Sequence, residues 1–310
     1  MHRTRPERAL GVTLIELVVA IVITGIVLAM TVYFANPVRQ SVDLAGRADL
    51  TDAADNALQR IGRDVRLALP NSVRVTTPVV GGPSYLEFIP IRTAGRYRAA
   101  GNGANTANNC GSLSADILSF GSAAETCFMT LGTLADAATV NATRDWLVLN
   151  NYSFASQDAY EAGAANRRQL SAITADTSPN RHRVNFTSSV ALDQVLHDSP
   201  GKRFFIAVGR IANPAQPEPV SYVCTPSLTG GGTLVRRWGY DLSATQPTSF
   251  TGGTLALIAG DVTACSFDYA SNVAPQIGLL TLRMDLSRTL SGGAVETVTL
   301  YHSVHVNNVP

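Results

Sequence analysis

The stretch GVTLIELVVAIVITGIVLAMTVYFA, from Gly11 to Ala35, decides how the rest of the sequence is interpreted. From Val12 onward it carries a single charged residue, Glu16. A helix of this length rises about 36 Å at about 1.5 Å per residue, enough to cross a bilayer core of about 30 Å. The apolar core of a cleaved secretory signal is shorter, at about 7–15 residues. We therefore predict a membrane-spanning helix over residues 12–35.

Basic residues in front of this helix predict its orientation. Arg3, Arg5 and Arg8 precede the apolar run, which favours a cytoplasmic N-terminus and an exported C-terminal part. A plain signal anchor that holds an exported domain, such as a periplasmic binding protein, is one interpretation. It leaves Glu16 unexplained, because an ionisable group at bilayer depth costs several kcal/mol and usually marks a functional site.

The composition suits a membrane segment joined to one large or two small soluble units. The chain has 310 residues, of which 45% are hydrophobic and 15% charged, so it is not a disordered composition. The net charge is only +1, and the first eleven residues already contribute an excess of positive charge. Without a strong excess of basic residues, nucleic-acid binding has little electrostatic support.

The helix is expected to continue beyond the membrane as an amphipathic segment over residues 36–70. Its apolar positions recur at steps of three and four, at Ala54, Leu58, Ile61 and Val65. Pro37 predicts a kink or short break, and Pro70 with Asn71 predicts the end of the helix. A coiled-coil stalk is the alternative, but the apolar stripe is short and rich in alanine.

Residues 71–310 have the pattern of a β-rich domain. Runs such as DILSF (116–120), TLALIA, IGLLTLRMDLS and ETVTLYHSVHV predict strands, and the SGG at 291–293 predicts a hairpin turn between the last two. The region from about 99 to 145 is rich in Asn, Ala and Gly and has weak periodicity. We expect it to be an inserted, disulfide-tied loop region.

Four cysteines, Cys110, Cys127, Cys224 and Cys265, do not have the spacing of a zinc site. In an exported domain two disulfides are expected. Four cysteines allow three connectivities, and we favour Cys110–Cys127 and Cys224–Cys265 because each pair is nearest in sequence and lies in a similar loop or strand setting. A disulfide at Cys265 is also favoured over a reactive thiol at that residue.

The N-terminal motif carries a family resemblance. The heptapeptide GVTLIEL, Gly11 to Leu17, resembles the leader junction of type IV prepilins and pseudopilins, although phenylalanine is usual where Val12 stands. The resemblance implies that residues 1–11 are a leader, which a prepilin peptidase removes after Gly11 before it methylates the new amine of Val12. It also implies that Glu16 pairs with the Val12 amine of a neighbouring subunit, so that its charge is compensated on assembly.

Further strings narrow this resemblance. ADLTDAADNALQRIGRDVRLALPNSVRV (48–75), LEFIPIRTAGRYR (86–98) and VHVNNVP (304–310) are similar to MshO-type minor pilins of the mannose-sensitive haemagglutinin (MSHA) pilus system. The similarity covers most of the chain and is weakest over about 99–198. It implies an α+β, pilin-like fold, in which a long N-terminal helix packs on an antiparallel β-rich domain. The related J-type minor pseudopilins of type II secretion are an alternative.

The resemblance also implies a structural role in pilus assembly, in the initiating or tip complex. The expected partners are the prepilin peptidase, major and minor pilins, the inner-membrane assembly platform and membrane lipid. The expected location is the bacterial inner membrane, as a single-pass protein with a periplasmic domain, followed by incorporation into the pilus. The sequence suggests no enzymatic activity, cofactor or metal.

Other candidate residues are weaker. His302 and His305 are three apart on a predicted strand, so their rings should point to opposite faces and a shared metal is not expected. The acids Asp116, Asp145, Asp158, Asp198 and Asp261 are dispersed in sequence. Trp146 and Trp238 lie in strand-like runs, which favours core or rim positions over a binding platform. The arginines of VRRW (235–238) could lie at an interface.

Overall fold

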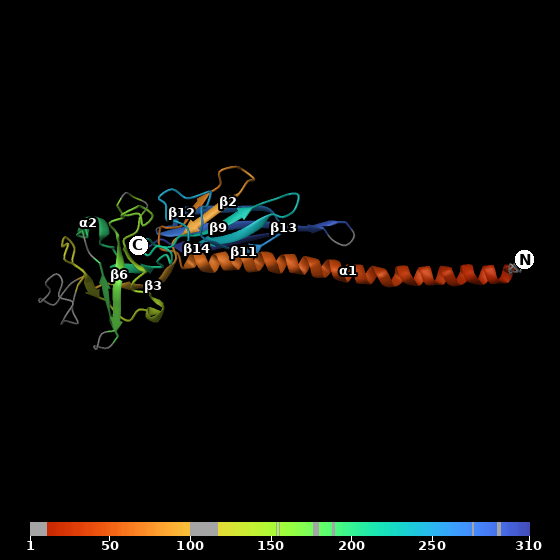
Figure 1. Ribbon diagram of the computed structural model, residues 1–310, viewed down its shortest axis with the longest axis horizontal. Helices are drawn as coiled ribbons and strands as arrows, with labels where there is room; N and C mark the ends of the chain where they lie inside the picture. Colours follow the sequence, from red (N-terminus) through yellow and green to blue (C-terminus); the bar gives the residue numbers. More distant parts are fainter. Residues whose placement is uncertain are drawn as a thin grey trace, which may run out of the picture.

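A computed structural model of the chain describes residues 11–99, 117–152, 154, 156–175, 180–187, 190–274, 276–289 and 293–310. Side chains at 32, 34–40, 42 and 272–274 lie outside that description. The described part consists of a long N-terminal helix followed by antiparallel β-sheets, so its class is α+β. Figure 1 shows an elongated molecule in which the first half of the helix extends away from the sheets.

Helix α1 runs from Leu14 to Arg66 without interruption. The break expected near Pro37 is therefore absent from the described backbone, since a proline removes only one hydrogen bond of the ladder. The helix also ends before Pro70. After Arg66 the backbone pairs with another segment instead, because Leu69 N donates to Ile89 O at 2.7 Å and Ile91 N donates to Leu67 O at 2.8 Å.

Two antiparallel sheets pack with the second half of α1. The five-stranded sheet has the order β1 (Arg74–Thr76), β2 (Ser84–Phe88), β9 (Val220–Thr225), β10 (Thr233–Trp238) and β11 (Thr254–Ala259). The three-stranded sheet has the order β12 (Val262–Ala274), β13 (Ile277–Thr289) and β14 (Val295–Asn307). The predicted hairpin between the last two strands is present, since β13 and β14 pair from Ile277↔Asn307 to Thr289↔Val295.

One hydrophobic core joins the helix to both sheets. The predicted apolar stripe of α1 is buried, and Ala54, Leu58, Ile61 and Val65 are each at most 3% exposed. Phe88 and Tyr222 of the five-stranded sheet belong to the same core as Leu280, Met284 and Val304 of the three-stranded sheet. The amphipathic pattern therefore docks the helix against the sheets instead of forming a coiled-coil stalk.

The third sheet belongs to a unit that is inserted between β2 and β9. Its order is β3 (Ile91–Arg96), β8 (Arg203–Ala207), β5 (Trp146–Leu149), β6 (Arg167–Ala175), β7 (His182–Phe186) and β4 (Cys127–Met129). Two short helices, η1 (Ala137–Thr139) and α2 (Gln194–His197), complete it. We call residues 91–207 the inserted unit, and it is larger than the loop region expected at about 99–145.

The inserted unit has its own aromatic core. Phe128 makes an edge-to-face contact with Phe204 at 5.0 Å between ring centroids, and Tyr97 and Phe186 pack on the same ring. In Figure 1 this unit, with β3, β6 and α2, lies at the end of the molecule opposite the N-terminus. The fold thus separates the exposed apolar helix from the inserted unit.

Contacts at the base of the inserted unit hold it against the rest of the fold. The Tyr160 hydroxyl donates to Ser72 O at 2.9 Å, and the Arg74 guanidinium lies 3.6 Å from the centroid of the Tyr160 ring. The Asn151 side chain donates to Pro70 O, and Asn71 donates to Asn151 O, both at 2.8 Å. These reciprocal bonds join the unit to the segment that follows α1.

Candidate functional site

The N-terminal end of α1 is capped by its own sequence. Thr13 has the extended backbone of an N-cap, and its hydroxyl accepts a hydrogen bond from Glu16 N at 3.3 Å. Threonine at the cap and glutamate three residues later form the sequence of a capping box. The Glu16 carboxylate also lies at the positive end of the helix dipole. This cap lets the helix begin at Leu14, which would be the third residue of a chain cleaved after Gly11.

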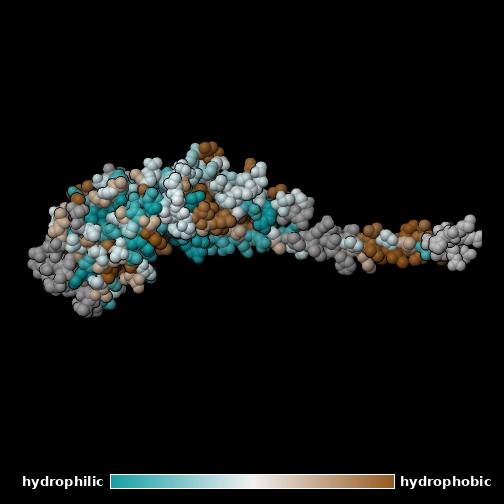
Figure 2. Space-filling model, in the orientation of Figure 1, coloured by the Kyte–Doolittle hydropathy of each residue, from teal (hydrophilic) through white to brown (hydrophobic). Residues whose placement is uncertain are grey.

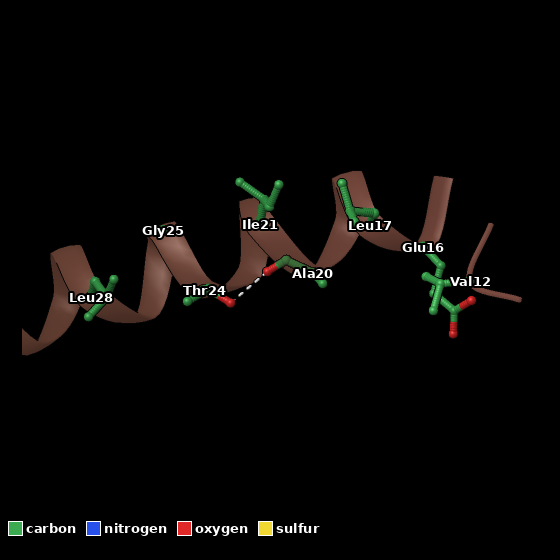
Figure 3. A pocket seen from close by; sticks show the side chains of 8 residues that line it. All are labelled: Val12, Glu16, Leu17, Ala20, Ile21, Thr24, Gly25 and Leu28. Carbon is green, nitrogen blue, oxygen red and sulfur yellow. Dashed lines mark hydrogen bonds between the residues drawn. The ribbon is translucent and has the colours of Figure 1, made fainter. Parts of the chain in front are cut away.

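A shallow apolar groove runs along one face of the first helical turns. Its walls are formed by residues spaced at one helical turn, namely Val12, Glu16, Leu17, Ala20, Ile21, Thr24, Gly25 and Leu28. Figure 3 shows the Glu16 carboxylate beside the Val12 side chain at one end of the row, while Leu17, Ile21 and Leu28 extend along the helix. The small side chains of Ala20, Thr24 and Gly25 leave the hollow between them. We call these eight residues the N-terminal groove.

The polar groups of this segment are satisfied within the helix. The Thr24 hydroxyl donates to Ala20 O at 2.6 Å, and Thr31 donates to Val27 O at 2.7 Å. Hydroxyl groups that bond back to the preceding turn present few free donors to the surroundings. Apart from Glu16, the side chains of the groove can therefore face an apolar environment without leaving a polar group unpaired.

The same segment exposes a large apolar surface. Among the described helices, Leu14–Thr31 is long and apolar enough to cross a membrane, and none of it is buried within the chain. Thirteen large apolar residues between Val12 and Met30 are exposed, with Leu14 at 83%. Covering them would contribute roughly 20 kcal/mol, at about 1.5 kcal/mol or more for each side chain. Figure 2 shows this hydrophobic segment well separated from the mixed surface of the sheets.

The predicted processing residues are exposed at the start of the helix. Gly11 has non-helical backbone, and an added Cβ there would meet nothing within 4 Å. Val12 and Glu16 are brought together at the groove, as their spacing on a helix requires. The cleavage after Gly11 and the pairing of Glu16 with a neighbouring amine remain predictions.

The cysteines lie in two parts of the fold. Cys224 on β9 and Cys265 on β12 form a disulfide, so the bond joins the five-stranded sheet to the three-stranded sheet. This is the pairing expected from their positions in sequence. Cys127 is fully buried at the start of β4, whereas Cys110 lies outside the described residues. The Cys110–Cys127 pairing therefore stays a prediction.

The remaining candidates are spread over the fold. His302 is half-buried while His305 is exposed, on either side of the buried Val304, so the two rings lie on different faces of β14. Among the described residues, no group of three or more His, Cys, Asp and Glu is close enough to hold a metal ion. Asp116 lies outside that part of the chain, and Asp145 is buried and paired with Arg92 at 2.6 Å.

The two tryptophans are half-buried, where core or rim positions were predicted. The Trp146 indole N–H donates to Pro214 O at 3.1 Å, and Trp238 packs against the main core. One arginine of the VRRW string, Arg236, holds α1 in place through Asp64 at 2.9 Å. Its role is therefore structural, because it joins the helix to β10 within the same chain.

A buried polar cluster escaped the sequence analysis. The Glu87 carboxylate, which is fully buried on β2, accepts hydrogen bonds from Arg74 at 2.7 Å and from the Tyr240 hydroxyl at 2.8 Å. Burial, together with the smaller effect of the Glu87 charge, raises the pKa of Tyr240, so its phenol keeps its proton. Glu87 and Tyr240 are 153 residues apart in sequence. Only the sheet pairing brings them together, so no local pattern could have identified them.

Comparisons with models of known protein families, with curated proteins and with solved structures gave no match.

Proposed function

We propose that this chain is a minor pilin of an MSHA-type type IV pilus, an assembly protein that acts by binding and not by catalysis. The observation that carries the proposal is the N-terminal groove, an uncovered apolar helix face with one carboxylate at its start. Such a face requires lipid before assembly and helices of other subunits after it. The leader-like motif ending at Gly11 supports the same pathway.

Glu16 gives the proposal its mechanism. In the unassembled protein its carboxylate lies at the edge of the membrane, where an uncompensated charge costs several kcal/mol. Removal of residues 1–11 would create a positive amine at Val12, and the same amine on a neighbouring subunit could pair with Glu16. A buried charge that is paired only in one register selects that register, because any other leaves it unpaired.

The position of the inserted unit supports a place at an end of the fibre. The unit adds bulk opposite the membrane helix and is joined to the rest of the fold by hydrogen bonds of Asn71, Asn151 and Tyr160. A subunit with such added bulk is more easily placed at the tip of a fibre than in every turn of its shaft.

The proposed partners are the prepilin peptidase, other major and minor pilins, the inner-membrane assembly platform and lipid. The sheets would lie in the periplasm.

The first experiment is the intact mass and N-terminal sequence of the membrane-extracted protein, with and without the prepilin peptidase. We expect a chain that starts at methylated Val12 only when the peptidase is present. An uncleaved leader in both strains would contradict the proposal and leave a signal-anchored periplasmic protein. Recovery of the processed protein with type II secretion components, and not with pili, would favour a J-type pseudopilin.

A second experiment addresses Glu16. The Glu16→Gln variant keeps the size and the backbone cap of the residue but removes its charge. We expect normal processing at Gly11 and at least a tenfold loss of incorporation into purified pili, with Asp52→Asn, on an exposed part of α1, as the control. Incorporation equal to that of the wild type would exclude the charge-pairing mechanism.

A further inference from the structure

The hairpin of β13 and β14 runs alongside α1 toward the exposed apolar segment. At one level, an added Cβ on Gly62 of α1 would lie 2.9 Å from His302 Nε2 of β14. At a second level, Arg47 Nε of the helix lies 3.2 Å from the Glu296 carboxylate of the same strand. Between these two levels α1 rises about 22 Å and β14 about 20 Å. The strand is therefore nearly parallel to the helix axis, and Figure 1 shows the hairpin extending along α1 beyond the other strands.

The tip of this hairpin lies near the end of the apolar segment. An extended backbone covers at most about 10 Å from Glu296 to Gly293, which corresponds to about seven residues of α1. Because α1 is continuous from Leu14 to Arg66, levels can be compared along one axis. The tip reaches about the level of residue 40 of the helix. Ala35, the last residue of the predicted span, is about 8 Å further along the axis.

These levels can be compared with the layers of a bilayer. A hydrocarbon core of about 30 Å takes about 20 helical residues. When Glu16 lies at one edge of the core, the other edge falls near Ala35. The headgroup layer adds about 5–8 Å on each side. On the side of the sheets, the hairpin tip consequently reaches the outer part of the headgroup layer.

The chemistry of the tip suits this position. Its described residues are uncharged and exposed, with Val295 at 67%, and they are Thr289, Gly293, Ala294 and Val295. The charged side chains begin directly behind them, and each has a partner of opposite sign. Arg288 pairs with Asp261 at 2.9 Å, and Glu296 pairs with Arg47. The tip can therefore approach lipid without taking an unpaired charge out of water, which would be costly.

We propose that this hairpin tip, Thr289 together with residues 293–295, rests on the lipid headgroups of the bilayer that α1 crosses. Contact at the tip would limit how deeply the helix sinks, and so would hold Glu16 at the opposite edge of the hydrocarbon core. Before assembly the sheets would lie directly on the membrane and not at a distance from it. The proposal rests on the membrane span of the proposed function, but it requires neither cleavage after Gly11 nor the pairing of Glu16.

The test is tryptophan fluorescence of the full-length protein in phosphatidylcholine nanodiscs, with and without a lipid that carries a nitroxide quencher on its headgroup. The probe is Val295→Trp, and the emission of the wild type, from Trp146 and Trp238, is subtracted. The matched control is Val195→Trp on α2, a site that is 87% exposed at the far end of the molecule. We expect the quencher to lower the added emission of Val295→Trp at least about twofold and to leave that of Val195→Trp unchanged. Equal responses at the two sites would overturn the proposal.

Two further variants separate the possible causes. Seven alanines inserted between residues 38 and 39 lengthen α1 by about two turns and move the hairpin about 10 Å away from the membrane. This insertion should abolish the quenching of Val295→Trp, and quenching that persists would overturn the proposal, because it would come from the tryptophan itself. Ile21→Trp reports on the span through a nitroxide on the acyl chains. If Ile21→Trp is quenched and Val295→Trp is not, the hairpin contact is wrong and the span remains; if Ile21→Trp is not quenched, the span fails and the hairpin contact fails with it.

Discussion

The Cys224–Cys265 disulfide joins two sheets of one core, and the cost of removing it follows from the chain between its ends. The two cysteines are 41 residues apart in sequence. In the chain-entropy description, a loop of that length lowers the entropy of the unfolded state enough to stabilise the fold by about 4 kcal/mol. Cys224 is fully buried, so its replacement by alanine would add up to about 1 kcal/mol from lost packing.

The assay is a set of three variants, Cys224→Ala, Cys265→Ala and the double variant, unfolded without reductant so that the other cysteines are undisturbed. Each single change already breaks the bond, so each should lose nearly the full 4 kcal/mol, and the double variant should lose little more. For a folded part of this size the loss lowers the melting temperature by about 10 °C. Losses below about 1 kcal/mol, or single losses that add in the double variant, would refute the reasoning.

Three further changes test how the helix and the sheets fit together. At Gly62 an added Cβ would meet His302 Nε2 at 2.9 Å, so Gly62→Ala should cost about 1–2 kcal/mol in denaturant unfolding, although alanine favours helices by about 1 kcal/mol. Asp64→Ala removes the acceptor of the Tyr222 hydroxyl and should cost about 2 kcal/mol in the same assay. Burial raises the pKa of Glu218 above its usual 4.5, so protonation favours the folded state. The stability that Glu218 contributes should therefore be present below the unfolded pKa and fall as the pH rises through the folded pKa, and Glu218→Gln should flatten that part of the pH–stability curve.

A different result would contradict each of these three predictions. Gly25→Ala is the control for Gly62, because a Cβ at Gly25 would meet nothing within 4 Å, and an equal response of the two would argue against a close helix–sheet contact. An unchanged midpoint for the Asp64 variant would mean that the Tyr222 hydroxyl finds water instead. A Glu218→Gln curve that is parallel to that of the wild type would show that other groups set the pH dependence.

The part of the fold that follows local patterns could be predicted. The apolar run of α1, the stripe through Ala54 and Val65, and the long alternating strands β13 and β14 depend on neighbours a few residues away. The end of the helix could not be predicted from its proline. Residues 67–69 pair with residues 89–91 and so end the helix before Pro70. This contact joins segments about 20 residues apart in sequence, so a short sequence pattern does not predict it.

The inserted unit shows the same limit more strongly. Strands β4 and β6 were missed, since β4 has only three residues and β6 begins with two arginines, which is unusual for a buried strand. The run DILSF (116–120) was predicted as a strand, and its described residues, 117–120, do not form one. Leu118 of this run is buried in the aromatic core of the unit. The apolar pattern therefore predicted the burial of Leu118 correctly, but it predicted the wrong secondary structure.

The place of the insertion explains how one chain can carry two separate surfaces. Strands β2 and β9 are direct neighbours, and their ends Phe88 and Val220 are paired across the sheet. A segment inserted between paired ends leaves the register of the sheet intact, because it enters and leaves at one point. The core that holds α1 is therefore built without β3 to β8, and the inserted unit closes a core of its own. Surface residues of that unit can consequently change without altering the helix face that we propose drives assembly.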